Sequence, residues 1–432
     1  MAGAAKPQPA RALATPRQYQ IEERANAILR TPRMQKTMEE ARRMLLATPP
    51  ASSEAARRTL QQMVTETAGF ATLTAASVDP RNPGLVWNIA GSKKWMGHSA
   101  PASRFAFDNP DNVYRYAIID DASTYVLDAQ SNGTAGRLTV TVYKAFVGAQ
   151  TTNWERAVAS ADEQRIRFDS IGKARITIGP VDPHDGSLYL NSGGGRMLLV
   201  REAIYDWGKQ HPRTISLQRV SGPKTRSRTF DESVAIAQDY LIAATQTVID
   251  QERTYSPLPI NGFASVARGF GKSMISMGRF HIANDEALVV NIRSQSADYI
   301  GTTVTSPWLI TRDYIDHSGS RTNRQSHQNP NGSYTYIVSS QDPGVANWLD
   351  TGGLLDGGMT LRWEGMNAPE AKLDDAITSV KLVKLTALRA ELPSGFPSIS
   401  ATDRQAEMVA RRRNYETRCG IPCRIEAGSE GN

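Results

Sequence analysis

The strongest constraint on the fold lies in residues 305–365, where the strand-like pattern is denser than elsewhere in the chain. Tyrosine, threonine and aliphatic residues alternate over residues 334–339, and Met359, Leu361 and Trp363 repeat a period of two further on. Successive side chains of a β-strand point to opposite faces of the sheet, so each run predicts a strand with one buried face. A fold that contains this stretch must be rich in β-sheet.

Turn residues flank these predicted strands. Asn331 and Gly332 stand just before the first one, and this dipeptide accepts positive φ at both centres of a tight turn, so it predicts a β-hairpin. The connection to the next strand holds an aromatic residue, an amide and two carboxylates, namely Asn347, Trp348, Asp342 and Asp350. Such a connection can form the rim of a ligand site. Core packing of Trp348 and a turn role for Asp342 are the alternative.

Several sequence blocks in this region resemble those of a known family. The blocks TRDY, SRTNRQ, DPGVANWLDTGG and LRWEG, in that order, are similar to the C-terminal β-sandwich of an uncharacterised bacterial family, domain of unknown function 1214. That domain is often paired with domain of unknown function 1254 in one chain. The remaining blocks of the same proteins are similar to the upstream blocks VYRYAIIDDASTYVL, VREAIYDWGKQHPRTISLQRV and GRFHIANDEALVVNI. The resemblance implies two jelly-roll-like β-sandwiches with helical insertions, and it implies no catalytic residue.

The order of patterns along the chain predicts an α+β protein that is mainly β. We expect a disordered lead over residues 1–17, a helical N-terminal segment over 18–75, a first β-sandwich domain over 76–225, a connecting helix over 226–255, a second β-sandwich domain over 256–395, and a basic helical tail over 396–432. The lead is rich in alanine, proline and glutamine, whereas the helical segments show apolar residues at helical spacing.

Composition bounds the class of protein. A chain of 432 residues with 40% hydrophobic content is long enough for two or three domains, each with a core. The formal net charge of +7 comes without a basic stripe, so nucleic acid is not an expected partner. The glycine-rich stretch over 262–278 lacks the spacing of a phosphate loop, and we expect no cofactor. Neither a membrane span nor a secretory signal is evident, which makes the cytoplasm the expected compartment.

The two cysteines, Cys419 and Cys423, lie close together near the C-terminus. Two are too few for a secreted scaffold held together by disulfides. One C-x3-C pair without a nearby histidine is also a weak metal signal. We therefore expect two ordinary thiols near a frayed terminus, and no metal site.

The candidate ligand-binding residues come from two regions. The second β-rich half contributes Trp308, Tyr314, Arg321, Asn323, Gln325, Asn347 and Trp348. An upstream block contributes Arg201, Asp206 and Trp207, because an arginine followed by a carboxylate and an aromatic ring suits an anionic group. A purely structural pairing of Arg201 with Glu202 or Asp206 is the alternative. The set predicts a small-molecule ligand of steroid-, isoprenoid- or aromatic-like character in the mouth of the second sandwich.

Whether the protein is an enzyme stays open at this point. His317 and His327 are the residues of this region whose ordinary pKa lies near neutrality. If chemistry occurs, we nominate His327 as acid or base, with Asp342 or Asp350 as the group that orients it. An exposed histidine without a role is the alternative.

Two other functions fit the same residues. A carbohydrate-active or carbohydrate-binding sandwich would use the aromatic residues for stacking and Asp342 with Asp350 as a carboxylate pair. A non-catalytic assembly module, such as a homo-oligomer, would use exposed sheet edges and the helical tail. A deep apolar cavity would favour the small-molecule function, a long groove the carbohydrate function, and neither feature the assembly module.

Overall fold

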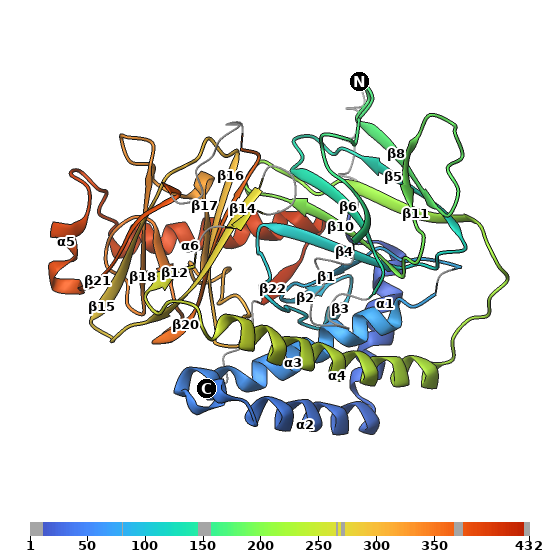
Figure 1. Ribbon diagram of the computed structural model, residues 1–432, viewed down its shortest axis with the longest axis horizontal. Coiled ribbons are helices and arrows are strands. Elements are labelled where there is room, and N and C mark those ends of the chain that lie inside the picture. Colours follow the sequence, from blue (N-terminus) through green and yellow to red (C-terminus); the bar gives the residue numbers. More distant parts are fainter. Residues whose placement is uncertain are drawn as a thin grey trace, which may run out of the picture.

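A computed structural model of the chain describes residues 12–79, 81–145, 157–264, 267–268, 273–366 and 375–426. Two β-sandwiches lie side by side, and helices run beneath them (Figure 1). The prediction of a mainly β fold with two sandwiches behind a helical N-terminal segment is confirmed. No helix in the described part of the chain is long and apolar enough to cross a membrane.

Three helices open the described chain: α1 (Pro16–Leu29), α2 (Pro32–Leu46) and α3 (Glu54–Ala76), with a short 3-10 turn at Pro49–Ser52 before α3. A threonine or serine hydroxyl caps the first turn of each helix. The predicted disordered lead is wrong for residues 12–17, because Leu13 and Ala14 are buried and α1 begins at Pro16. Residues 1–11 lie outside the described part.

The first sandwich packs two antiparallel-rich sheets face to face. One sheet has the order β1 (Val86–Asn88), β4 (Asn112–Ile118), β10 (Met197–Ala203), β6 (Arg137–Tyr143) and β7 (Ala157–Ala161). The other has the order β11 (Thr214–Ser221), β5 (Thr124–Gln130), β8 (Lys173–Gly179) and β9 (Leu188–Asn191). Leu127, Val140, Ile176 and Val200 belong to the apolar core between them. The outer face of the first sheet turns toward the helices.

The long helix α4 (Phe230–Tyr255) links the two sandwiches, as the sequence predicts. Thr229 and Glu232 form a reciprocal capping box at its start. The apolar face of α4 packs against α2 and α3 through residues such as Val234 and Leu241. The helices thereby form one layer beneath the sheets (Figure 1).

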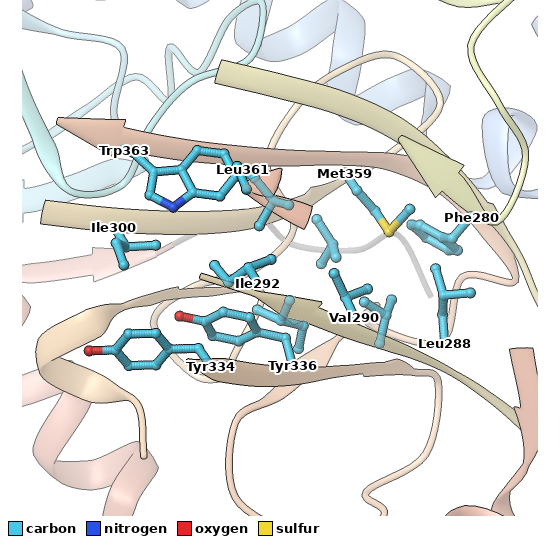
Figure 2. Close-up of a cluster of buried hydrophobic side chains, with 14 of the residues drawn as sticks. Phe280, Leu288, Val290, Ile292, Ile300, Tyr334, Tyr336, Met359, Leu361 and Trp363 are labelled. Carbon is cyan, nitrogen blue, oxygen red and sulfur yellow. The ribbon is translucent and has the colours of Figure 1, made fainter. Parts of the chain in front are cut away.

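The second sandwich contains the alternating runs from which the sequence analysis began. Its first sheet has the order β12 (Gly262–Phe263), β14 (Ser273–His281), β20 (Asp356–Glu364), β16 (Tyr299–Thr305) and β17 (Ser320–Thr322), with β13 (Ala267–Arg268) beside β14. Its second sheet has the order β19 (Trp348–Asp350), β18 (Tyr334–Ser339), β15 (Glu286–Ile292) and β21 (Ile377–Lys384). Met359, Leu361 and Trp363 point into the core toward Tyr336, which confirms the predicted period of two (Figure 2).

The core of the second sandwich is tightly filled. A cavity between its sheets, lined by residues that include Val290, Tyr336 and Leu361, measures about 10 Å³. That volume is the size of a single water molecule, whereas drug-sized ligands occupy sites of about 300 Å³ or more. This cavity therefore has no room for a small-molecule ligand.

The hairpin predicted at Asn331 and Gly332 is wrong, although a turn forms there. Gly332 has a φ of 81° and its N–H donates to Asn329 O at 2.9 Å. The strand that follows, β18, pairs with β15 and β19 and not with the preceding β17. The tight turn thus reverses the chain locally, while the tertiary fold decides the strand partner.

The C-terminal tail is helical, as predicted, but it is packed into the molecule. Helix α6 (Ala401–Glu416) runs from the second sandwich toward the first (Figure 1). A short turn, η6 (Thr417–Cys419), leads to β22 (Arg424–Glu426), which pairs with β2 (Ser92–Trp95) beside β3 (His98–Ala100). Cys419 is buried and forms a disulfide with Cys423, so the expectation of two free thiols near a frayed end is wrong.

Candidate functional site

Three arginines of the tail form a buried ladder. Arg404, Arg411 and Arg418 recur every seven residues, which is about two helical turns, so they share one side of the tail. Arg411 Nε donates to Tyr314 O at 2.6 Å, and its guanidinium lies 4.2 Å from the centre of the Trp207 ring. We call these three residues the arginine ladder.

The outer two members of the ladder also have hydrogen-bond and aromatic partners. Arg404 donates to Asp342 Oδ2 at 2.9 Å and to Val345 O at 2.6 Å. Arg418 donates to Pro110 O at 2.5 Å and stacks on the Tyr415 ring at 4.0 Å. The ladder therefore ties the tail to both halves of the molecule.

Many predicted site residues are partners of this tail. They are Trp207, Tyr314, Arg321, Gln325, Trp348 and Asp342. Arg321 lies 2.5 Å from Glu407 Oε1 of α6, and Trp207 donates from Nε1 to Asp111 Oδ1 at 2.9 Å. The structure brings these side chains together, but their partners are residues of α6 and not a ligand.

Other predicted ligand residues brace loops or the core. Asn347 adopts a positive φ of 55° and holds the loop of His327 through its amide, which accepts from His327 N at 2.7 Å. Asn323 donates to Asp298 O at 3.1 Å. Trp308 is buried and donates from Nε1 to Ala56 O at 2.7 Å, which joins the second sandwich to α3.

The predicted histidine and its orienting carboxylate are not partners. The His327 ring packs edge-on against Phe396, with ring centres 5.5 Å apart. Asp350 instead contacts His317, whose Nδ1 lies 2.6 Å from Asp350 Oδ2. Asp342 is engaged by the tail. The predicted pairing of His327 with Asp342 or Asp350 is therefore wrong. The fold places Asp350 beside His317 and Asp342 beside Arg404.

The pairing of Arg201 proposed as the alternative is also corrected. Glu202 is fully buried inside the first sandwich, where Arg115 Nη1 donates to it at 2.6 Å and Arg213 Nη1 at 3.1 Å. Adjacent residues of a strand point to opposite faces, so Arg201 and Glu202 on β10 cannot meet. Asp206 is partly exposed and lies 3.6 Å from Lys209.

Arg201 lies instead on the outer face of the first sandwich, where it meets the second. We call Arg201 with Tyr114, Tyr143, Arg362 and Glu364 the junction cluster. Tyr114 is the direct cross-strand partner of Arg201, and Tyr143 stands on the neighbouring β6. From the second sandwich, Glu364 Oε1 comes within 3.8 Å of Arg201, which is beyond hydrogen-bond distance.

The Arg201 side chain is largely surrounded by protein but is partly exposed to solvent. Burial is the largest influence on the pKa of Arg201 and lowers it, but Glu364 and the tyrosines more than offset it, so the pKa lies above its ordinary value. Its side chain still keeps 31% of its surface exposed. It donates no hydrogen bond to any residue of the described ranges. Arginine carries five N–H donors in a planar fork, which suits recognition of an anionic group.

The remaining members of the junction cluster define the chemistry around Arg201. Burial raises the pKa of Tyr114, against the opposing effect of the two arginines, so its phenol is neutral and can donate. Arg362 donates to Phe107 O at 3.0 Å and brings a second positive charge. Leu199 stands two residues before Arg201 on the same outer face of β10 and is partly exposed. The cluster therefore combines two arginines and two tyrosines with the apolar side chain of Leu199.

Sequence reasoning found Arg201 but missed Arg362 and Glu364. Both belong to the block LRWEG, in which Trp363 is buried in the second core. The period of two places Arg362 and Glu364 together on the opposite face of β20, and this signal was present in the sequence. The described residues hold no group of three or more histidine, cysteine or acidic side chains arranged to bind a metal.

Comparisons with known proteins bear on the fold. No protein-family model and no curated protein matches this chain. Among solved structures, it is similar to an uncharacterised protein from Burkholderia cenocepacia, with a TM-score of 0.65 and 19% identity over 84% of this chain and 99% of that one. A protein from Vibrio parahaemolyticus gives a TM-score of 0.40 and 12% identity over 65% of this chain and 91% of that one.

The Burkholderia match shows a shared fold with an uncharacterised bacterial protein, and at 19% identity it shows nothing more. The resemblance to domain of unknown function 1214 stays a prediction, since it rests on sequence blocks alone.

Proposed function

We propose that this protein binds a small, largely apolar molecule that carries an anionic group, such as a carboxylate, at the junction cluster, where the two sandwiches meet, and not in the filled core of the second sandwich. The observation that supports this function is the state of Arg201. Its guanidinium is crowded by protein, keeps 31% of its side chain exposed, and has its nearest carboxylate at 3.8 Å. Arginine binds carboxylates through two parallel hydrogen bonds, and such charge-assisted bonds are about twice as strong as neutral ones.

The charges of the cluster favour an anion. Arg201 and Arg362 bring two positive charges and Glu364 one negative charge, which leaves a net charge of about +1 before a ligand arrives. The phenol of Tyr114 and the side chain of Leu199, both partly exposed, supply apolar surface beside it. Ligand sites commonly combine apolar walls with a few polar groups that fix orientation.

A matched pair of probes tests this function. We expect 4-phenylbutanoate to bind and 4-phenylbutanamide, which has the same shape without the charge, to bind at least tenfold more weakly by isothermal titration calorimetry. Arg201→Gln should abolish the difference between the two probes. The control is Arg175→Gln, because Arg175 pairs with Asp128 on the exposed surface of the first sandwich. Equal binding of both probes, or unchanged binding by Arg201→Gln, contradicts the proposal.

We further infer that the chain is a distant member of the group that contains domain of unknown function 1214. The sequence blocks over residues 114–363 and the two-sandwich fold support this membership.

We also infer that the protein works in an oxidising compartment and not in the cytoplasm expected from the sequence. The Cys419–Cys423 bond supports this, since disulfides persist chiefly in such compartments. Alkylation of protein taken directly from its native cells, followed by mass spectrometry, tests it: labelled Cys423 contradicts the inference.

A further inference from the structure

A second group of residues outside the junction cluster has the geometry of a proton-transfer site. His317 Nδ1 lies 2.6 Å from Asp350 Oδ2, and the His317 side chain is 49% exposed while Asp350 is 7% exposed. The second oxygen of Asp350 accepts from Gly352 N at 2.8 Å. The carboxylate is therefore fixed, and it fixes the imidazole in turn. With Nδ1 engaged by Asp350, Nε2 is the ring nitrogen that can exchange a proton with water or a substrate.

The backbone around both residues is held in place. Asp313 Oδ1 accepts from the backbone N–H groups of Ile315 and Asp316, at 2.7 and 3.0 Å, which forms the turn that leads to His317. Asp350 N donates to Ser318 O at 3.2 Å, so the loop of the histidine and the strand of the carboxylate are joined beside the side-chain contact. A site supported in this way keeps its geometry when a substrate approaches.

Charged groups face the pair from several elements. Asp313 and Asp316 lie on the loop of His317, and Arg412 of α6 engages Asp316. Buried Arg312 donates to Thr351 O at 3.1 Å beneath the pair. From α3, exposed Arg58 donates to Gly353 O at 3.2 Å, next to the glycine that holds Asp350.

We propose that His317, oriented by Asp350, is the general base of a hydrolytic site for small esters that carry an additional anionic group. Water loses a proton to His317 Nε2 as its oxygen attacks the ester carbonyl. The tetrahedral intermediate then breaks the bond between carbon and the leaving oxygen, and the imidazolium returns the proton to that oxygen. The products are one acid and one alcohol, and the step needs no other reactant.

The preference for an anionic ester comes from Arg58. Its guanidinium reaches the turn at Gly352 and Gly353, which carries the hydrogen bond to Asp350. The positive charge of this exposed side chain, next to the turn that holds Asp350, favours the approach of an anionic substrate. The site is therefore expected to hydrolyse mono-4-nitrophenyl succinate faster than 4-nitrophenyl acetate.

The chain supplies a matched control for the test. His184 also stands near an aspartate, but its Nδ1 is 3.7 Å from Asp182 Oδ1 and its side chain is 85% exposed. Release of 4-nitrophenol from mono-4-nitrophenyl succinate should fall at least tenfold in His317→Gln and stay unchanged in His184→Gln. Unfolding curves of both variants should match the wild type. Equal rates in His317→Gln and the wild type overturn the proposal.

A pH profile separates catalysis from a structural role of the pair. The hydrogen bond from Asp350, together with its charge, raises the pKa of His317 above its ordinary value, against the opposing effect of burial. A general base acts when it is neutral, so the rate should rise with pH through that pKa. Asp350→Asn should lower the rate and move the midpoint to lower pH. A midpoint that does not move in Asp350→Asn also overturns the proposal.

Discussion

Two groups of arginines in this molecule differ in how their guanidinium groups are used. In the arginine ladder of the tail, each guanidinium has aromatic and hydrogen-bonding partners close by, as in Arg411 with Trp207 and Tyr314. Arg201 in the junction cluster has one carboxylate at 3.8 Å and keeps 31% of its side chain exposed. The arginines of the ladder therefore hold the tail to the rest of the molecule, whereas Arg201 in the junction cluster keeps donors that a ligand can use.

The difference teaches how a ligand site is told apart from a structural network. Burial alone does not separate them, because burial is also the largest influence on the pKa of Arg201. The distinguishing property is whether the donors have partners. Burying a guanidinium without hydrogen-bond partners costs free energy. Buried guanidinium groups are therefore usually hydrogen-bonded to the protein, to water or to a ligand. Substitutions in the arginine ladder and at Arg201 should therefore affect stability and ligand binding differently.

The largest effect is expected from Trp207→Ala. Trp207 is buried, donates to Asp111, and lies against both Arg411 and Arg418. Its removal leaves a cavity, takes the aromatic partner from Arg411 and leaves Arg418 with Tyr415 alone, and loss of a buried tryptophan costs about 3–5 kcal/mol. Urea unfolding followed by fluorescence measures the loss. A loss below about 1 kcal/mol would return Trp207 to the ligand-binding role that the sequence first indicated.

The next effect concerns Asp108, a buried carboxylate that accepts from Thr311 N at 2.8 Å and lies near the buried Arg104. Burial raises the pKa of Asp108 from 3.8 to about 6, while Arg104 and the N–H of Thr311 oppose the rise. Because the folded pKa lies above the unfolded one, the stability that this group contributes is present below pH 3.8 and is lost as pH rises through about 6. At about 1.4 kcal/mol per pKa unit, the loss is at most about 3 kcal/mol.

Asp108→Asn isolates this contribution. The free energy of unfolding of the variant, minus that of the wild type, should rise between pH 4 and 6 and then level off. Denaturant unfolding at several pH values gives this difference directly. A difference that falls with pH would show that Asp108 is stabilised as the charged form by Arg104.

Much of the fold was predictable because its signals are local. The alternation of Met359, Leu361 and Trp363 and the apolar spacing in α4 come from neighbouring residues in the sequence. The pairing of β18 was not predictable in this way. Asn331 and Gly332 set a tight turn, but the partner strand β15 lies more than forty residues upstream and is chosen by packing of the whole sandwich.

The candidate site was harder to predict for the same reason. The chemistry of Arg201 made it an anion-binding candidate, yet its neighbour Glu364 comes from the other sandwich. His317 and Asp350 stand 33 residues apart, and nothing in the local sequence favoured that pair over His327 with Asp350. Composition likewise could not reveal that the tail covers Trp348. Contacts between distant segments decide a site, and one sequence does not contain them.

A smaller effect is expected from the disulfide that ends the arginine ladder. Cys419 and Cys423 are separated by 4 positions, so the bond closes a short loop directly after Arg418. Closing a loop of this length stabilises a fold by about 2 kcal/mol through the entropy of the unfolded chain. The double variant Cys419→Ala with Cys423→Ala should unfold at lower urea, and reduction of the wild type should have the same effect. Unchanged stability after full reduction would mean that the ladder holds the tail without the bond.

The smallest change in stability is expected at Arg201. In Arg201→Gln the folded state loses one ion contact at 3.8 Å and no hydrogen bond to the described residues, so the free energy of unfolding should change by less than about 0.5 kcal/mol. The same variant should lose the rise in melting temperature that 4-phenylbutanoate gives the wild type, because a ligand stabilises only the state that binds it. A loss of stability comparable to that of Trp207→Ala would place Arg201 with the ladder, as a structural cation. Retained stability with lost ligand response is the combination that only a binding residue produces.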